Sequence, residues 1–351
     1  DLQTWILVQR ARAPGGDRLS ASTRIRAMNA LWMLVASVLF SVMGACVKLA
    51  GRHYGVTEIL FYRSVIGAAC LFAFVHVRGV SLSTPLAGLH LRRGVVGTAA
   101  VFLWFYATTV LPLGTALTLN YTSPLFLALL VMGVAMRSGR RIDWPLMATV
   151  GIGFVGVILV LQPNFAPGQA IGAAAGLFSG VLSAIAYWQV KELGERGEPE
   201  WRVVFYFSLT GAILGGVGSL AIGFTEHTPA GALLLLVIGI STLLAQLAMT
   251  RAYGQGRTET AASLQFSAIV FASVLGVMLF DDKIPLIGWA GIAVIIASGI
   301  GSTALTARRR APATAARLPP TACRARHRWS TCRSLRLPWW SRTAHGHRDA
   351  G

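Results

Sequence analysis

The sequence LVASVLFSVMGACVK at residues 34–48 returns in altered form as LFSGVLSAIAYWQVK at residues 177–191, and this recurrence decides the fold class. Both stretches are apolar almost throughout and both end at a lysine. The residues that return 143 positions later are Leu34, Val38, Leu39, Val47 and Lys48, matched by Leu177, Val181, Leu182, Val190 and Lys191. Self-similarity at a fixed spacing indicates that one structural unit is present twice.

The repeat extends through the rest of the apolar part of the chain. Three further groups return in the same order, at spacings that drift only as short loop insertions allow. They are Phe61, Tyr62, Ser64, Gly67 and Ala68 (again at 205, 206, 208, 211 and 212), Thr115, Ala116, Leu119, Phe126 and Leu130 (again at 260, 261, 264, 271 and 275), and Pro145, Leu146, Gly151 and Ile152 (again at 285, 286, 291 and 292). Two tandem units therefore make up most of the chain.

The composition is that of an integral membrane protein. Of the 351 residues, 54% are hydrophobic and 13% are charged, whereas soluble proteins carry about 25% charged residues. A spanning helix needs ~20 mostly apolar residues, and continuous apolar runs such as 230–240 exclude the alternating strands of a β-barrel. The predicted spans are 29–50, 57–77, 94–111, 114–136, 143–162, 170–191, 202–224, 230–251, 258–280 and 284–306.

Five spans per unit have a topological consequence. A unit with an odd number of spans leaves the chain on the opposite side, so the second unit inserts upside down relative to the first. The expected fold is all-α integral membrane, with ten transmembrane helices as two inverted five-helix repeats, an arrangement typical of secondary transporters. The predicted divisions are a disordered basic arm (1–28), the two repeats (29–162 and 170–306) and a disordered basic tail (307–351).

The net charge of +18 reflects Lys and Arg residues placed on one side of the membrane, and it does not indicate a nucleic-acid partner. Lys and Arg gather in the two ends of the chain and in alternate loops, for example Arg78, Arg92 and Arg93 in the second loop and Arg137, Arg140 and Arg141 in the fourth. Positive residues remain on the cytoplasmic side of a membrane. Both termini are therefore predicted to be cytoplasmic, and the lipid bilayer is the expected surrounding. A homodimer is left open.

Arg63 is the most informative single residue, because it lies inside the second predicted span. A charge within hydrocarbon usually faces a cavity or a partner, so Arg63 is a candidate for solute binding or gating. The alternative is that the long side chain extends to the membrane surface. Its counterpart in the second repeat is Phe207, so this charge belongs to one half only.

Polar residues also recur at matched positions of the fourth and ninth spans. Pro124 follows Asn120 and Ser123, and a proline within a helix removes a backbone hydrogen bond and introduces a kink. The second repeat has Gln265 and Ser267 at the corresponding place. We expect Asn120, Ser123, Gln265 and Ser267 to contact a solute between the halves; hydrogen bonding between helices is the alternative.

Aromatic and acidic residues complete the candidate set. Tyr106, Tyr121 and Trp188 are predicted to supply apolar walls, although aromatic residues in spans often only pack or mark the membrane interface. Glu259 and Asp282, at the two ends of the ninth span, are candidates to carry a coupling proton; simple solvation of these carboxylates is the alternative.

No catalytic constellation, metal site or cofactor motif is predicted. The histidines make no spaced pair within a span, and the chain has no phosphate-binding loop of the G-x-x-x-x-G-K-[ST] type, so ATP is not the expected energy source. Residues 151–156 match G-x-G-x-x-G, but they lie inside an apolar span. Close helix packing is therefore the expected role of these glycines.

With these features the chain resembles the drug/metabolite transporter superfamily, in particular its ten-span EamA-type members. The resemblance rests on Phe61-Tyr62-Arg63, on the stretch from Asn120 to Phe126, and on Arg251-Ala252-Tyr253 before a span that ends Leu279-Phe280-Asp281-Asp282. It implies a carrier of small organic metabolites in a bacterial inner membrane, often an exporter. Relatives of this type move amino acids, nucleosides, cofactors or S-adenosylmethionine. The acid expected after the fourth span is absent here.

The function expected from the sequence is therefore secondary transport of a small organic solute, an amino acid or a related molecule. Alternating access is the expected mechanism, with export as the direction and a proton as the coupling ion. An enzyme is not expected. A non-transporting membrane scaffold or receptor-like protein is the alternative from a different class, and solute flux is the observation that separates the two.

Overall fold

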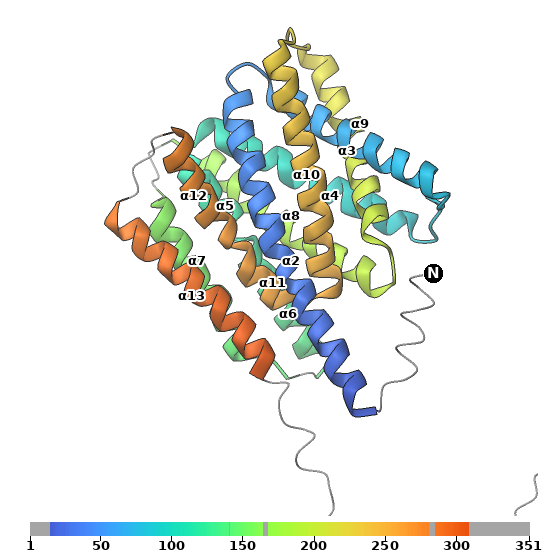
Figure 1. Cartoon of the computed structure of the whole chain (residues 1–351). Coiled ribbons are helices and arrows are strands. Elements are labelled where there is room, and N and C mark those ends of the chain that lie inside the picture. The colour runs from blue at the N-terminus through green and yellow to red at the C-terminus, as the bar shows by residue number, and fades with distance from the viewer. Residues whose placement is uncertain (1–14, 112, 140, 164–167, 281–284, 309–351) are drawn as a thin grey trace, which may run out of the picture. The chain divides into compact units, whose positions relative to one another are not determined.

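The computed structural model describes residues 15–111, 113–139, 141–163, 168–280 and 285–308, and every regular element in this part of the chain is a helix (Figure 1). The helices are α2 (Gly15–Ala50), α3 (Val56–Arg78), α4 (Ala87–Val110), α5 (Leu113–Asn120), α6 (Ser123–Arg137), α7 (Trp144–Leu161), α8 (Ala170–Glu195), α9 (Glu200–Ile222), α10 (Pro229–Gln255), α11 (Thr258–Gln265), α12 (Ser267–Phe280) and α13 (Leu286–Arg308).

The predicted spans correspond to these helices in order. Nine helical segments of the described chain are long and apolar enough to cross a membrane, and α4, which covers the predicted span 94–111, is the further helix of the set. Two predicted spans are each built from two short helices: 114–136 from α5 and α6, and 258–280 from α11 and α12. The fold is therefore an all-helical membrane fold with two interrupted spans.

The two interruptions lie at matched positions of the repeat. In the first half the helix is broken at Tyr121 and Thr122, directly before Pro124 at the start of α6. In the second half it is broken at Phe266, 145 residues after Tyr121, where the chain has no proline. Backbone irregularity at membrane depth is tolerated where protein covers it, and Phe266 is fully buried.

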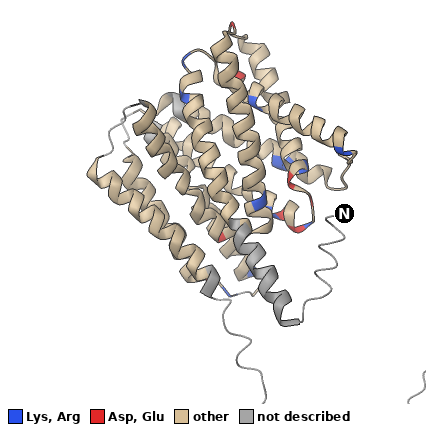
Figure 2. Cartoon of the chain, in the orientation of Figure 1, with Lys and Arg blue, Asp and Glu red and all other residues tan. Residues whose placement is uncertain are grey.

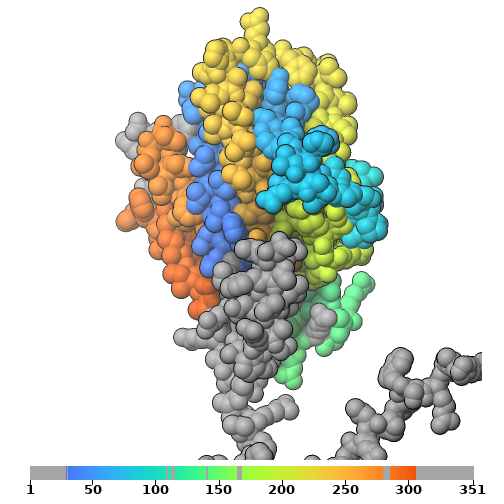
Figure 3. All heavy atoms as spheres, turned by 45° about the vertical axis from the view of Figure 1, so that its right-hand side comes forward, coloured from blue at the N-terminus to red at the C-terminus, as the bar shows by residue number. Residues whose placement is uncertain are grey.

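The most extensive helix packing joins one half of the chain to the other. The pairs are α2 with α10, α3 with α9, α4 with α8, and α7 with α13. By their order in the two repeats, α2 corresponds to α8, α3 to α9, α4 to α10 and α7 to α13. Exchanging each helix for its counterpart turns the α2–α10 pair into the α8–α4 pair and leaves the α3–α9 and α7–α13 pairs unchanged. A two-fold relation between the halves produces this set of pairs. Figure 3 shows α2 lying between α10 and α12, both of which it contacts.

Glycines permit close approach of the helices in the α3–α9 and α7–α13 pairs. A Cβ on Gly67 would lie 3.0 Å from Ser208 Oγ, and a Cβ on Gly211 would lie 2.6 Å from Ser64 Oγ. Ser64 and Ser208 occupy one position of the repeat, and Gly67 and Gly211 occupy another. On the α7–α13 pair, a Cβ on Gly156 would lie 2.8 Å from the carbonyl oxygen of Gly291. Gly153 and Gly156 of the G-x-G-x-x-G at 151–156 therefore pack closely against other helices, as predicted, whereas nothing lies within 4 Å of a Cβ on Gly151.

The outward faces suit a hydrocarbon solvent. Most of the length of the described helices carries no charged residue, and the Lys, Arg, Asp and Glu residues gather mainly toward helix ends and loops (Figure 2). Large apolar side chains such as Phe72, Ile213 and Leu286 are exposed. An apolar surface of this extent indicates contact with lipid.

Two helix boundaries differ from the prediction. Helix α2 begins at Gly15, so residues 15–28 of the predicted disordered arm are helical; no proline or glycine interrupts the chain between residues 17 and 28. Helix α4 begins at Ala87, so Arg92 and Arg93 lie in a helix and not in a loop. Residues 1–14 and 309–351, most of the predicted arm and tail, lie outside the described residues.

Candidate functional site

A buried cavity lies between α3, α9 and α10, and we call it the Arg63 cavity. Its lining combines one cation with hydroxyl and amide groups: Arg63, Ser64, Gly67, Phe207, Ser208, Thr242, Leu243 and Gln246. The free volume is about 10 Å³, room for about one water molecule. Residues 63–67 belong to the first half and the others to the second, so both repeats contribute to this cavity.

Arg63 does not extend to the surface. Its side chain is 7% exposed, and its Nε has no hydrogen-bond partner among the described residues. No carboxylate of the described chain lies within ion-pair distance of Arg63. Holding an ion away from water costs several kcal/mol unless a partner compensates. The alternative in which Arg63 reaches the membrane surface is therefore wrong, and its guanidinium is available to the cavity.

Arg93 on α4 is a second buried cation, which sequence reasoning had assigned to a loop. It is 3% exposed, and both Nε and Nη1 are without a hydrogen-bond partner in the described chain. Its guanidinium lies 4.2 Å from the ring centroid of Phe207, a cation–π distance. Gly97, one turn further along α4, leaves the space that this guanidinium occupies. Phe207 thus borders Arg93 as well as the Arg63 cavity.

Three side chains from the second half form a compact polar group that we call the Tyr187 cluster: Tyr187, Tyr253 and Gln265. Gln265 accepts a hydrogen bond from the Tyr253 hydroxyl at 2.5 Å and donates one to the Tyr187 hydroxyl at 3.2 Å. The two tyrosine rings stack, with centroids 5.0 Å apart and an angle of 13° between the planes. The three side chains thus form one connected polar group between α8, α10 and α11.

The predicted pair of amides, Asn120 and Gln265, is not brought together. Asn120 donates to Ser179 Oγ at 3.0 Å, whereas Gln265 binds Tyr187 two turns further along α8. The two contacts are ~12 Å apart along the helix axis. Each amide makes a hydrogen bond between helices, the alternative considered from the sequence. Ser123 is fully buried at the start of α6, and Tyr121 is half-buried beside it.

The other predicted residues lie apart from this region. Tyr106 is 45% exposed, and Trp188 is half-buried with the Lys191 ammonium 4.5 Å from its ring centroid. Ser267 donates to the carbonyl of Leu264 at 2.7 Å, within its own span. Glu259 lies 3.9 Å from Arg257, and Arg257 binds Asp143 more closely, at 3.1 Å. Asp282 lies outside the described residues.

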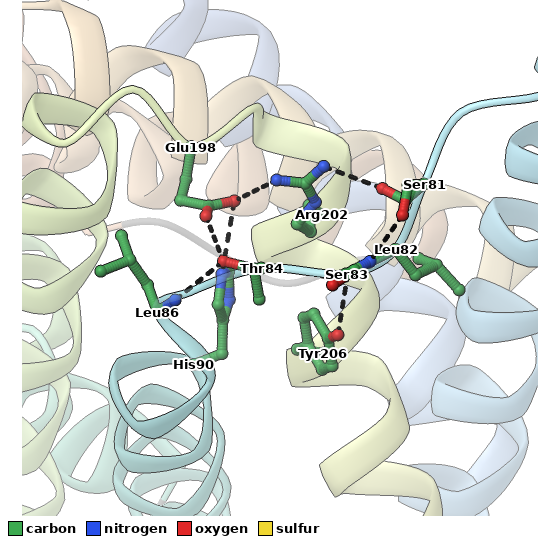
Figure 4. A network of polar contacts seen from close by, with 9 residues as sticks. All are labelled: Ser81, Leu82, Ser83, Thr84, Leu86, His90, Glu198, Arg202 and Tyr206. Carbon is green, nitrogen blue, oxygen red and sulfur yellow. Dashed lines mark hydrogen bonds and ion pairs between the residues drawn. The ribbon is translucent and has the colours of Figure 1, made fainter. Parts of the chain in front are cut away.

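Polar contacts tie the α3–α4 loop to the start of α9, and we call them the Glu198 network (Figure 4). Glu198 accepts a hydrogen bond from Arg202 at 2.9 Å and another from Thr84, and its carboxylate lies 3.5 Å from His90 Nε2. Arg202 also donates to the carbonyl of Ser81 at 2.8 Å. Burial alone raises the pKa of Glu198, but Thr84, Arg202 and His90 together hold it below the ordinary value. The carboxylate is therefore stabilised in its charged form.

The counterpart of this network lies at the start of α3, and we call it the Glu58 cluster. Glu58 is 1% exposed, accepts from the backbone N–H of Thr225 at 3.3 Å, and lies 3.5 Å from His227 Nε2. Tyr62 packs edge-on against His227, with ring centroids 5.1 Å apart. Glu58 and Tyr62 occupy the repeat positions of Arg202 and Tyr206. The start of α3 therefore binds the α9–α10 loop, and the start of α9 binds the α3–α4 loop. The two contacts involve corresponding positions of the two repeats.

Several of these residues were not singled out from the sequence, namely Glu58, Arg93, Glu198, Phe207 as a neighbour of Arg93, and Tyr253. A partial signal exists for two of them. Tyr253 stands in Arg251-Ala252-Tyr253, which was noted as a family motif, and Gly97 stands four residues after Arg93 on the same helix face. Glu58 carries no local signal, and Glu198 shows only the common four-residue spacing to Arg202, because Thr84, His90 and the partners of Glu58 come from distant segments.

The chemistry available in this region is recognition of charge and polarity. Arg63 lines a cavity with hydroxyl and amide groups, Arg93 lies against Phe207 of the same lining, and among the described residues neither guanidinium has an ion-pair partner. Among the described residues no group of three or more His, Cys, Asp or Glu side chains could hold a metal ion. Groups of this kind can recognise a charged or polar molecule.

Comparisons with known proteins agree with this description. The model of the EamA-like transporter family matches residues 27–162 and again residues 170–303. The chain is 30% identical over 274 residues to the pseudopaline exporter CntI of Pseudomonas aeruginosa, covering 76% of this chain and 93% of the exporter. It is 27% identical over 276 residues to a riboflavin transporter of Rhizobium johnstonii, covering 78% of this chain and 90% of that protein.

A solved crystal structure of a protein supports the fold alone. It superposes on this chain with a TM-score of 0.69 at 22% identity, and covers 81% of this chain and all of the other. The same family model matches each half of the chain, in agreement with a unit that is present twice.

Proposed function

Because the chain belongs to the EamA-like transporter family, we propose that it is a secondary transporter that exports a small organic metabolite across a bacterial inner membrane by alternating access. The family match and the apolar helices support a multi-pass membrane protein related to metabolite transporters.

The single observation that carries the proposal is a buried polar region to which both halves contribute. The Arg63 cavity is lined by α3 on one side and by α9 and α10 on the other. Arg93 of the first half lies against Phe207 of the second. A solute held here contacts both halves, so relative movement of the halves changes the side from which the solute is reached.

The two end clusters support alternating access. The Glu198 network closes the α3–α4 loop onto α9, and the Glu58 cluster closes the α9–α10 loop onto α3. Both are formed in this structure, and the cavity between them has room for about one water molecule. Ligand pockets for metabolites are typically about 300–1,000 Å³. Entry of a solute therefore requires one of the two clusters to open.

Direction and coupling complete the proposal. Export is also the direction in the name of the Pseudomonas aeruginosa relative, the pseudopaline exporter. A proton is the proposed coupling ion, with Glu259 and Asp282 as the proposed carriers. Glu259 lies at the start of α11, where Arg257 and Asp143 also meet, so protonation of its carboxylate would alter this group of charges.

Flux tests the proposal. Proteoliposomes loaded with a bacterial small-molecule extract should release particular organic solutes faster than protein-free vesicles, as measured by mass spectrometry of the exterior. An acidic exterior should accelerate this release through proton entry, and Glu259→Gln should remove the acceleration. If no solute leaves faster with protein present, the chain is not a transporter and the scaffold alternative is correct.

A further inference from the structure

Two buried cations have no counter-charge within ion-pair distance in the described part of the chain. Arg63 and Arg93 are both at least nine-tenths buried, and among the described residues Nε of Arg63 and both Nε and Nη1 of Arg93 have no hydrogen-bond partner. The carboxylates whose ion pairs the structure describes bind other partners, for example Glu192 with Arg92 and Glu198 with Arg202. The charge of each buried guanidinium is thus left to be balanced by a bound molecule.

The two guanidiniums face a shared neighbour. Phe207 lines the Arg63 cavity and lies 4.2 Å from the Arg93 guanidinium. Arg63 thus lines the cavity directly, and Arg93 lies next to it through the shared neighbour Phe207. Phe207 is the repeat counterpart of Arg63, so the second half offers an apolar ring at the place where the first half offers a charge.

The rest of the cavity lining carries no charge: Gly67, Phe207 and Leu243 are apolar, and Ser64, Ser208, Thr242 and Gln246 are polar. Ser208, Thr242 and Gln246 contribute hydroxyl and amide groups from α9 and α10, and the hydroxyl of Thr242 has no hydrogen-bond partner in the described chain. Both cations come from the first half and these neutral groups from the second. A molecule bound here would place acid groups toward α3 and α4 and its uncharged polar groups toward α9 and α10.

We infer that the transported solute is an organic dianion with two separate acid groups, one held by Arg63 and the other by Arg93. The inference rests on the proposed function and adds the substrate class. Arginine matches this role, because its planar fork binds a carboxylate or a phosphate through two parallel hydrogen bonds. One acid group would leave one cation uncompensated, whereas two balance both.

The test uses the purified full-length protein in detergent and a series of straight-chain dicarboxylates of increasing length. Each dicarboxylate is compared with its own monoamide and diamide, which keep the shape and remove one or both charges. At least one dicarboxylate should raise the midpoint of thermal unfolding, its monoamide should do so less, and its diamide should not. Equal stabilisation by the dicarboxylate and its diamide, or no stabilisation by any dicarboxylate, would overturn the inference.

Variants assign the two cations. Arg63→Gln and Arg93→Gln should each weaken binding of the stabilising dicarboxylate at least about tenfold. The matched control is Arg92→Gln, which removes an exposed arginine of α4 that pairs with Glu192 at 3.0 Å, and it should bind as the wild type does. Without ligand, the two buried variants should be at least as stable as the wild type, because each loses an uncompensated charge. Marked destabilisation of either variant would show a structural role and contradict the inference.

Binding and transport measurements together distinguish a wrong substrate class from a wrong transporter function. If neutral solutes are transported while dicarboxylates neither bind nor move, the transporter proposal stands and the substrate class is wrong. If dicarboxylates bind with the expected dependence on both arginines but no solute crosses the membrane, the binding site stands and the transporter proposal falls.

Discussion

Single residues determine how the ends of the bundle are closed, and Glu198 is the clearest case. Its buried carboxylate binds Thr84, Arg202 and His90, which come from three different segments of the chain. Removing one partner from a buried charged network costs more than removing an exposed ion pair, because the remaining groups are left without water. The Glu198 network should therefore contribute measurably to stability, in contrast to the ion pairs on the helix surfaces.

Glu198→Gln should lower the free energy of unfolding by about 2 kcal/mol at neutral pH. The pKa of Glu198 is lowered in the folded protein, so the stabilising charge is present above the ordinary carboxyl pKa and is lost as the pH falls through the lowered value. The difference between variant and wild type should therefore shrink toward zero in acid, as followed by thermal unfolding across pH. The control is Glu195→Gln, which removes an exposed pair with Lys191 and should cost less than about 0.5 kcal/mol. A constant difference at every pH would contradict the assignment.

At the level of helices, the interrupted spans show what sequence reasoning reaches and where it ends. Pro124 predicted an irregularity in the fourth span, and the structure has the break directly before it. The break at Phe266 has no proline and carries no local signal, although it lies at the repeat position of the break at Tyr121. Helix packing depends on similar pairings of distant positions: Ser64 and Gly211 meet although nothing near either residue in the chain indicates the contact.

Gly215 should be among the least replaceable residues of the α3–α9 pair. A Cβ there would lie 2.9 Å from the backbone nitrogen of Phe61, which cannot turn aside as a side chain can. Gly215→Ala should therefore destabilise the protein by about 1–3 kcal/mol. The matched control is Gly44→Ala in α2, where nothing lies within 4 Å and alanine should stabilise the helix by up to about 1 kcal/mol. Thermal unfolding of both variants in the same detergent gives the comparison, and equal midpoints would refute the close contact.

For the whole molecule, the repeat and the apolar segments were sufficient to predict an all-helical membrane fold with its helices in the observed order, and the family model matches both halves. The site was predicted only in part. Arg63 was identified because a charge inside an apolar segment is conspicuous, whereas Arg93 was missed because it follows Arg92 at the edge of a segment. The two neighbours point to different sides of α4, and only the packing of α8 and α9 determines that one of them is buried.

The topology remains a prediction from the distribution of Lys and Arg, and cysteine labelling tests it. In a background without the four native cysteines, Ala166→Cys should react in intact cells with a reagent that cannot cross the membrane. Ser138→Cys and Arg196→Cys should react only after the cells are opened, because arginine-rich loops remain in the cytoplasm. Labelling of Ser138→Cys in intact cells would reverse the predicted orientation.

The pairing of helices across the two halves bears on how the protein is made. The ribosome delivers α2, α3, α4 and α7 before any of their principal partners, α10, α9, α8 and α13, has been synthesised. For that interval the newly inserted first half presents its glycine-lined faces, and the guanidiniums of Arg63 and Arg93, to lipid or to the insertion machinery. Nascent chains stalled near residue 165 should therefore remain bound to that machinery, and release should follow synthesis of the partner helices. The principal helix pairs of the first half therefore form only after the second half has been synthesised.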